Sequence, residues 1–393
     1  MMIFRGFFSA SKIWVNFLPN EPVPPVTNTD LLVQSMKVAP EWLIFASNEC
    51  FEGNYILPYF LAQNAVCAAV MLLFASWWVL NFQPDRTTIP CSIGENMVAK
   101  VILNPYSNRR NAHKRWPQAE AALRAAGIAF ELAVSERPKD VIQLAAQAAR
   151  QGFAPIIAAG GDGTVGEVVN GLAQVRPETD FGTLGILPLG TANDLAANLG
   201  LPRDLWQMAR ILAAGKTRSI DVGCVNGLYF VNNSAVGLEP YVTQKQTTIH
   251  WIKGVARYLV AAVQGIFDHP SWNGRLEWDD GSYEGPLTLV SVGNGARTGG
   301  LFYMSPHADP SDGKLTFVYG YRSSRLRLLA LLPKTLSPRG EFLHEAGIQE
   351  VNCTHLQIRL DRPSPAHADG ELFPHRVTEV NYRILPQSLR VLV

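Results

Sequence analysis

The pattern of apolar and polar positions changes along the chain. Between residues 98 and 187, short apolar runs alternate with longer segments that favour helix. The apolar runs are 98–103, 130–134, 155–159 and 184–187. The helical segments are 111–126 and 138–151, and each of them is followed by a glycine. Strands that alternate with helices of this length predict a parallel sheet with helices on both faces. We therefore expect a doubly wound parallel α/β domain over residues 97–222.

After about residue 221 the apolar runs follow one another with few helical segments between them. Five runs favour strand: 228–234, 275–278, 287–292, 314–319 and 356–360. The sequence Asp279-Asp280-Gly281-Ser282 is typical of a hairpin turn, and segments 251–267 and 325–332 favour helix. This pattern predicts a second, mainly antiparallel β domain over residues 223–393.

The first 96 residues differ from the rest. Residues 61–80 contain no charged side chain, and this stretch is long enough to cross a bilayer. Three interpretations stay open: a single membrane span, a buried core helix, or an extension that the native protein lacks because its translation starts at Met97.

Composition narrows the class of protein. A chain of 393 residues with 47% hydrophobic residues is large enough for two or three domains with sizeable cores. A net charge of +1 argues against a general nucleic-acid binder. The five cysteines show no paired metal-ligand spacing, which fits a reducing compartment better than a disulfide scaffold.

A glycine-rich loop, Gly160-Gly161-Asp162-Gly163-Thr164, follows the third apolar run. Glycine allows the backbone to approach a phosphate closely, and free amides at a helix start form an anion site. Thr164 and Glu167 match a capping box, so we expect a helix to begin at the glycines. The loop predicts a nucleotide phosphate cradle, and the alternative is a tight strand-to-helix turn.

A second corner of this kind lies fewer than forty residues downstream. Leu187-Pro188-Leu189-Gly190-Thr191-Ala192-Asn193-Asp194 places a glycine and a hydroxyl after the fourth apolar run. Two such corners on neighbouring parallel strands meet at the same edge of the sheet, where ligands of open α/β folds bind.

With these two corners, the chain resembles the diacylglycerol kinase catalytic domain family, which includes sphingosine kinases and bacterial lipid kinases. The resemblance covers roughly residues 97–393, and its motifs occur in a fixed order: Asn104 to Asn108, Gly160 to Gly171, Gly190 to Ala196, Phe230 to Asn233, Pro306 to Leu315, and Asp369-Gly370-Glu371. The first glycine-rich loop alone is less specific, because NAD kinases and phosphofructokinases use a similar one.

The resemblance implies a β-sandwich as the second domain, with the active site in the cleft between the domains. It also implies ATP and Mg²⁺ as cofactors. The residues that it assigns to nucleotide binding are Asn104, Pro105, Ser107, Asn108, Ser135, Gly160, Gly161, Asp162, Gly163, Thr164, Gly166, Glu167, Gly190, Thr191, Asn193 and Asp194.

Similarity to the family marks Glu371 as the general base on a lipid hydroxyl, with Asp369 beside it. A carboxylate within hydrogen-bond reach can take the hydroxyl proton as the P–O bond forms. Asp162 lies inside the phosphate cradle and is expected to act with Mg²⁺ or a hydrogen-bond network, or to stabilise the turn.

The segment Ala308 to Leu315 concentrates carboxylates and carbonyls, the ligands that hard cations prefer. From the residues alone it equally fits a β-turn. In relatives a structural Mg²⁺ is held here, which implies ligation by Asp309, Asp312 and the backbone carbonyl of Lys314.

The chain departs from the family pattern in two places. Asn108-Arg109 occupies positions where glycine is common, and Glu239 stands where relatives often have Asp, which puts its metal or substrate role in doubt. The histidines, including His307, His367 and His375, show no ligand spacing and are expected to be structural or exposed.

We expect an ATP- and Mg²⁺-dependent lipid kinase acting on diacylglycerol or a related lipid, such as a sphingoid base. The expected partners are the lipid substrate, the membrane surface and, as one option, a second copy of the chain, but not nucleic acid. The expected location is the cytoplasmic face of the inner membrane, either peripheral or anchored through residues 61–80. Two other hypotheses are an NAD-kinase-like small-molecule kinase and a catalytically silent lipid- or nucleotide-binding protein.

Overall fold

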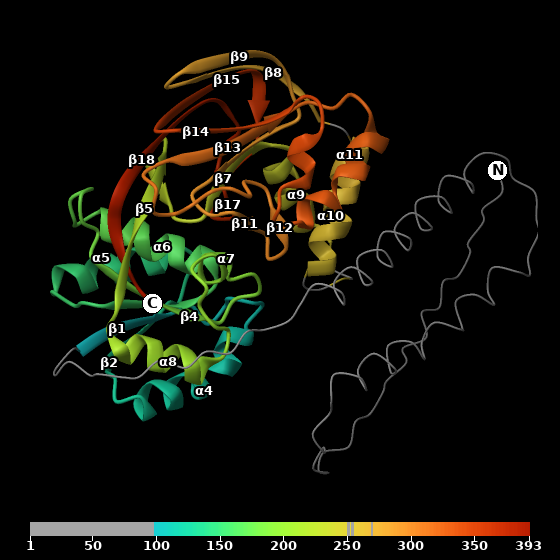
Figure 1. Ribbon diagram of the computed structural model, residues 1–393. Helices are drawn as coiled ribbons and strands as arrows, with labels where there is room; N and C mark the ends of the chain where they lie inside the picture. The colour runs from blue at the N-terminus through green and yellow to red at the C-terminus, as the bar shows by residue number, and fades with distance from the viewer. Residues whose placement is uncertain (1–97, 250–251, 253–254, 269) are drawn as a thin grey trace, which may run out of the picture. The chain divides into compact units, whose positions relative to one another are not determined.

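The computed structural model describes residues 98–249, 252, 255–268 and 270–393 (Figure 1). The segment 61–80 and the expected start at Met97 lie outside these residues. Within the described part of the chain, no helix is both long and apolar enough to cross a bilayer.

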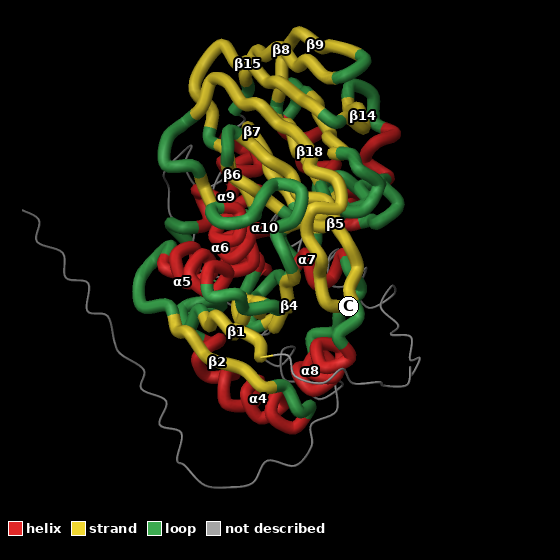
Figure 2. Tube along the Cα trace, turned by 90° about the vertical axis from the view of Figure 1, so that its left-hand side faces the viewer, coloured by secondary structure: helices red, strands yellow, loops and turns green. Residues whose placement is uncertain are grey.

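Four parallel strands form the centre of the first lobe, in the order β2–β1–β3–β4: β1 (Val98–Leu103), β2 (Ala129–Val134), β3 (Ile156–Gly160) and β4 (Thr183–Pro188). Figure 2 shows α5 (Asp140–Arg150) and α6 (Asp162–Ala173) over one face of this sheet, and α4 (Asn111–Ala125) and α8 (Leu205–Ala214) over the other. Every residue of β3 is buried, because helices cover both faces of the sheet.

Two antiparallel sheets form the second lobe. One has the order β14–β13–β10–β7–β16–β17, with bounds Ile348–Cys353, Leu315–Gly320, Leu289–Gly293, Asn233–Gly237, Ala366–Ala368 and Glu371–Leu372. The other contains β5 (Thr217–Val225), β6 (Leu228–Phe230), β8 (Trp272–Trp278), β9 (Gly281–Leu287), β15 (His355–Ser364) and β18 (Val377–Leu392). Side chains of both sheets, including Phe230, Phe317 and Tyr382, form one buried core.

This architecture confirms the predicted fold class, a doubly wound parallel α/β domain followed by an antiparallel β-sandwich. The hairpin at Asp279-Asp280 is also confirmed, because β8 and β9 pair with Trp278 opposite Gly281. The sequence patterns missed α8, β5, β14 and the long last strand.

Strand β18 belongs to both lobes. It pairs antiparallel with β15 and β5, and its end pairs parallel with β4, with Arg390 opposite Thr183. One ten-stranded sheet therefore runs from the first lobe into the second. The strand is irregular at Pro386, where the register with β5 shifts between Leu385 and Leu389. Proline interrupts a strand pattern, which explains why the sequence did not reveal this element.

Three helices lie beside the six-stranded sheet of the sandwich, and the first of them contacts β7 and β10: α9 (Leu238–Gln246), α10 (Val255–Asp268) and α11 (Arg325–Leu331) (Figure 1). They bury their own apolar cluster, which includes Val242, Ile266, Phe302 and Leu328. Helices α10 and α11 lie where the sequence favours helix, and α9 was not predicted. Three short elements complete this side, α7 (Asp194–Asn198), β11 (Arg297–Thr298) and β12 (Phe302–Tyr303).

Candidate active site

Hydrogen bonds join the loops that follow β1, β3 and β4. The Ser107 and Thr164 hydroxyls lie 3.0 Å apart, which links the first loop to the glycine-rich loop. The Thr191 hydroxyl donates to Asn108 Oδ1 at 2.9 Å, which links the first loop to the second corner. The three loops therefore converge at one edge of the sheet, as the two-corner pattern predicts.

The glycine-rich loop leads directly into α6. Gly161 is the residue before the first helical turn, and no side chain caps this helix. The predicted capping box of Thr164 and Glu167 is therefore wrong, because the Thr164 hydroxyl instead faces Ser107. An uncapped helix start leaves first-turn amides available to an anion.

Gly190 brings the two corners into contact. A Cβ atom on Gly190 would lie 2.4 Å from the Gly161 Cα atom, so only glycine fits here. The Gly190 amide donates within the protein, to the Gly160 carbonyl at 2.9 Å and to Asn193 Oδ1 at 3.0 Å. Gly190 therefore serves close packing of the corners, and its amide is already used.

Asp162 and Asp194 form a buried acidic pair behind these loops. Asp162 Oδ1 accepts from the Leu195 amide at 3.2 Å, so this side chain binds the start of α7. Both Asp194 oxygens accept from the Gly300 amide at 3.0 Å, which ties α7 to the second lobe. Burial raises the pKa of both carboxyls, and the nearby Asp162 charge helps to raise that of Asp194 to about 7.

Asp369 is buried and anchors its own turn. Its carboxylate accepts three backbone N–H groups, from Val231 at 2.9 Å, Asn232 at 2.9 Å and Asn233 at 3.1 Å. Burial raises the pKa of Asp369 to about 7, and the three N–H groups act in the opposite direction. The side chain thus fixes the turn that carries Glu371.

Glu371 is exposed and lies against the first turn of α6. Its Oε1 atom lies 2.8 Å from the position that a Cβ atom on Gly163 would occupy. Asp369 Oδ2 lies 3.2 Å from the corresponding position on Gly166. The late acidic turn of the second lobe therefore packs on the glycine-rich helix start of the first, and the structure brings together the two motifs that the sequence singled out.

Gly163→Ala is expected to impair activity without unfolding the protein. The new methyl group would collide only with the flexible end of Glu371, so stability should stay the same or rise by about 0.5 kcal/mol, because alanine favours helix. If Glu371 acts as the expected general base, its displacement should cost on the order of 10- to 100-fold in kcat. Phosphate-transfer kinetics and urea denaturation of the variant check both parts.

The control is the same change in a Glu371→Gln background. If Gly163→Ala acts only by moving Glu371, it should add nothing once that carboxylate is gone. A further loss in the double variant would show that the methyl group disturbs the phosphate cradle itself.

A cleft of about 560 Å³ opens between the lobes next to this contact. Its lining includes Asn108, Arg109, Asp162, Thr191, Arg257 and Asp369. Burial and the nearby Arg109 charge lower the pKa of the Arg257 guanidinium. The two arginines come from opposite lobes and repel each other. An anion bound between them would relieve this repulsion. Sequence reasoning missed Arg257, which belongs to no motif.

Asn108 and Arg109 adopt the left-handed conformation, with φ of 52° and 53°. Arg110 continues it with φ of 69°. Such angles favour glycine, the residue that the resemblance led us to expect in this loop. The departure from the family pattern therefore keeps the loop shape at some conformational cost and adds positive charge to the cleft.

Glu167 lies in a second cavity on the other side of the acidic turn. This cavity of about 340 Å³ is also lined by Gly163, Gly166 and Glu371. Burial and the Glu371 charge raise the pKa of Glu167 to about 7. Of the predicted nucleotide residues, Ser135 is buried after β2, and its amide donates to the Leu103 carbonyl at 2.9 Å. Ser135 is absent from the lining of either cavity.

The raised pKa values predict that folding stability falls as pH rises. Glu167, Asp194 and Asp369 have pKa values of about 7 when folded, and ordinary values of about 4 when unfolded. Between these pH values the folded protein holds protons that the unfolded chain has released, so these groups favour folding in acid and this contribution is lost through pH 7.

Urea denaturation should show a decrease on the order of 2 kcal/mol in the free energy of unfolding from about pH 5 to about pH 8. Asp369→Asn removes one of the three groups and should make the slope shallower. An increase over this range would contradict the assignment.

The predicted metal turn at Asp309, Asp312 and Lys314 lies against β5 and β18, away from the cleft. Asp309 Oδ1 accepts from the Ser311 amide at 3.0 Å and lies 3.4 Å from the Arg218 guanidinium, and Asp312 Oδ1 accepts from the Lys314 amide at 2.9 Å. Buried Asp221 holds the turn, since it accepts from the Gly313 amide at 2.7 Å. In the described ranges, no three His, Cys, Asp or Glu side chains converge on a common point.

Glu239 is buried where α9 meets the sandwich. Its carboxylate accepts from Asn233 Nδ2 and Ser291 Oγ, each at 2.8 Å, and lies 3.2 Å from His367 Nε2. Burial alone would raise the pKa of Glu239, but the hydrogen bonds from His367, Ser291 and Asn233 outweigh it and hold the pKa below its ordinary value. This carboxylate therefore has a structural role, and His367 is a buried structural histidine, as expected.

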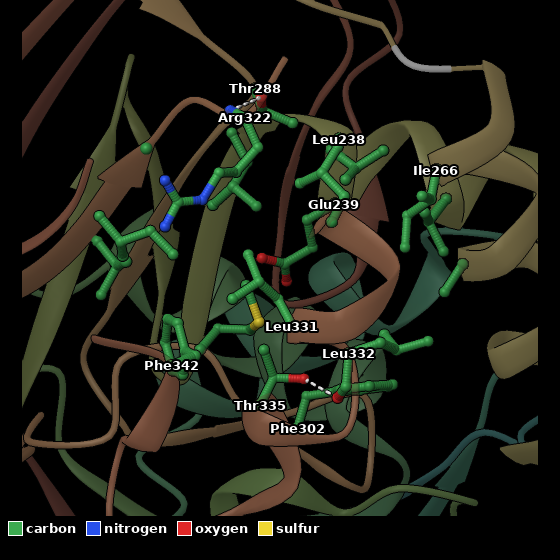
Figure 3. A pocket seen from close by; sticks show the side chains of 18 of the residues that line it. Leu238, Glu239, Ile266, Thr288, Phe302, Arg322, Leu331, Leu332, Thr335 and Phe342 are labelled. Atoms are coloured by element: carbon green, nitrogen blue, oxygen red, sulfur yellow. Dashed lines mark hydrogen bonds between the residues drawn. The ribbon is translucent and has the colours of Figure 1, made fainter. Parts of the chain in front are cut away.

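An apolar pocket of about 110 Å³ lies between these helices and the sandwich (Figure 3). Its lining includes Leu238, Ile266, Phe302, Leu331 and Leu332. Glu239 and Tyr258 line both this pocket and the cleft. An apolar pocket therefore adjoins the polar cleft through two shared side chains, an arrangement suited to a ligand with one apolar and one polar end.

Comparison with protein families matches both lobes. Residues 98–225 match the model of the diacylglycerol kinase catalytic domain. Residues 233–393 match the model of the YegS C-terminal NAD kinase beta sandwich-like domain.

Individual relatives agree with these matches. The chain is 32% identical over 257 residues to the Probable lipid kinase YegS-like of Chromohalobacter salexigens, covering 65% of this chain and 81% of that protein. It is 29% identical over 277 residues to the diacylglycerol kinase of Bacillus subtilis, and this match covers 70% of this chain and 89% of that protein. The crystal structure of a diacylglycerol kinase from Bacillus anthracis superposes with a TM-score of 0.58 at 22% identity, covering 76% of this chain and 97% of that one, and shows the same fold.

Proposed function

Since this chain belongs to the diacylglycerol kinase catalytic domain family, we propose that it is an ATP- and Mg²⁺-dependent lipid kinase. It transfers the γ-phosphoryl group of ATP to a hydroxyl of diacylglycerol or a related lipid. The observation that carries this proposal is the shared wall of the polar cleft and the apolar pocket, formed by Glu239 and Tyr258. A lipid acceptor needs both environments at once.

The cleft fits a nucleotide triphosphate. The uncapped start of α6, the Thr191 hydroxyl and the cationic pair Arg109 and Arg257 would hold the phosphates. Asp162 and Asp194 line the cleft, and burial raises the pKa of both carboxyls, which a bound cation would lower again. The Arg297 guanidinium, 3.4 Å from Asp194, already supplies one positive charge there. Bound Mg²⁺ would supply neutralisation of the phosphate charge.

Glu371 is the group that removes the acceptor proton. Phosphoryl transfer depends mainly on position and electrostatics, and an aligned carboxylate adds general-base assistance. Asp369 is a positioning residue, because its oxygens are occupied by three backbone amides. The lipid chains would lie against the apolar pocket, and the adjoining cleft extends to Asp369 and Gly370, in the turn that carries Glu371.

A structural Mg²⁺ at Asp309, Asp312 and the Lys314 carbonyl stays part of the proposal. Each carboxylate has one oxygen that is not used within the turn, which a hard cation could share. Arg218 already supplies positive charge to Asp309. The homodimer expected from the sequence also stays a prediction.

Radiolabelled phosphate transfer from ATP over a panel of acceptors tests the function. The panel contains diacylglycerol, monoacylglycerol, sphingosine and NAD. Transfer to a lipid supports the proposal, and transfer to NAD alone would favour an NAD-kinase-like enzyme. Nucleotide binding without transfer to any acceptor would favour a silent binding protein.

A further inference from the structure

Helix α11 presents an unusual combination of side chains to solvent. Leu326 is 75% exposed, more than any other large apolar side chain in the described part of the chain. Its neighbours Arg325 and Arg327 are exposed as well. Neither arginine side chain forms an ion pair or hydrogen bond with a described residue. One helical turn therefore presents an apolar side chain between two arginines that form no salt bridge with a described residue, although their charges help to lower the pKa values of Asp268 and Glu345.

The carboxylates nearest to these arginines already have other partners. Asp268 lies 2.6 Å from Lys245. Glu345 lies 2.5 Å from Lys334 and 3.4 Å from Arg322. The charges of Arg325 and Arg327 thus add to a balanced surface and make the outer side of α11 positive.

The inner side of the same helix lines the apolar pocket. Leu328 is buried and forms part of the pocket wall. Leu331 and Leu332 line the pocket as well (Figure 3). The neighbouring α10 contributes Leu259 and Phe267, which are only partly buried against this cluster. Helix α11 therefore forms part of the pocket wall on one side and is exposed to solvent on the other.

We propose that α11 docks the protein on an anionic lipid surface. Leu326 inserts among the acyl chains, and Arg325 and Arg327 contact lipid phosphates. An anionic lipid surface is the partner that matches these side chains best, because it is anionic outside and apolar inside, and because the helix that meets it also bounds the apolar pocket. This inference rests on the proposed function, since docking there brings the pocket to its substrate.

Sedimentation with lipid vesicles tests the docking. The full chain is compared with Leu326→Glu and with an Arg325→Glu/Arg327→Glu double variant. The vesicles are phosphatidylcholine alone or equal parts of phosphatidylcholine and phosphatidylglycerol. Binding to the anionic vesicles should weaken by about tenfold or more in each variant, and binding of the unchanged chain to the neutral vesicles should be weaker than to the anionic ones.

The first lobe offers a matched control. Trp206 on α8 is 42% exposed and Arg210 on the same helix is exposed, but neither lines any of the cavities described above. A Trp206→Glu/Arg210→Glu variant should bind vesicles as the unchanged chain does. Docking through α11 is overturned if this control loses binding equally, if the α11 variants bind normally, or if neutral vesicles bind as well as anionic ones.

Activity on two forms of one substrate separates docking from damage to the pocket. On a short-chain diacylglycerol dissolved as monomers, the α11 variants should keep their kcat/KM. On long-chain diacylglycerol in anionic vesicles, it should fall by about tenfold or more. Equal losses on both forms would overturn the docking role. If the unchanged chain phosphorylates no lipid at all, the proposed function fails, while sedimentation still decides the docking.

Discussion

Glu371→Gln should reduce phosphate transfer by about 100- to 10,000-fold, the usual contribution of a positioned general base. The side chain is exposed and keeps its shape in the variant, so folding should not change. Because the carboxylate lies against Gly163 at the start of α6, it faces the place where the γ-phosphate would be held. The variant should still bind ATP, as measured by calorimetry, while its kcat falls.

An exposed glutamate that lines neither the cleft nor the second cavity provides the control. Glu284 on β9 is exposed, and Glu284→Gln should leave both transfer and nucleotide binding unchanged. Full transfer by Glu371→Gln would mean that another group takes the acceptor proton. Loss of ATP binding would mean that Glu371 holds the nucleotide and does not act on the acceptor.

Asp369→Ala should destabilise the protein by about 3 kcal/mol or more. The change leaves three buried N–H groups, those of Val231, Asn232 and Asn233, without their acceptor. Each unsatisfied buried donor costs about 1–3 kcal/mol, and the relief of a buried charge offsets part of this. Urea denaturation measures the loss, and faster hydrogen exchange of these three amides would locate it.

Asp369→Asn is the graded control. Its carbonyl oxygen can still accept from Asn232 and Asn233, which both bond to Oδ1, so only the Val231 amide loses its acceptor. We expect a loss of about 1 kcal/mol for this variant. If alanine and asparagine cost the same, the carboxylate does not act as a clamp on these amides.

Much of the site could be predicted because its motifs are local. The strand, glycine turn and helix around Gly161 lie within a short stretch of sequence, and the same holds for the corner at Gly190. Parallel strands bring such corners to one sheet edge without any further information. The contact of Glu371 with Gly163 joins residues far apart in the chain, and it was expected only through resemblance to a family.

What the sequence did not reveal depends on distant partners. The capping box failed because Ser107, which precedes Thr164 by 57 residues, faces its hydroxyl. An Asp-Gly-Glu sequence is typical of an exposed turn, but Asp369 is buried and accepts hydrogen bonds from the backbone amides of residues 231–233. The hydrogen-bond set around Glu239 comes from four separate elements, and Arg257 faces Arg109 only after both lobes have folded. No local sequence pattern encodes such contacts between residues that are far apart in the chain.

The last strand has a consequence for biosynthesis. Leu389, Val391 and Leu392 belong to the core of the first lobe, although they follow the strands of the second lobe in the sequence and are therefore made after them. Until they are made, the edge of β4 at Thr183 lacks its neighbouring strand, and the sheet of the first lobe is incomplete. The first lobe can therefore complete its fold only after β18 has been made. An early stop codon that removes this strand would destabilise the lobe that was synthesised first.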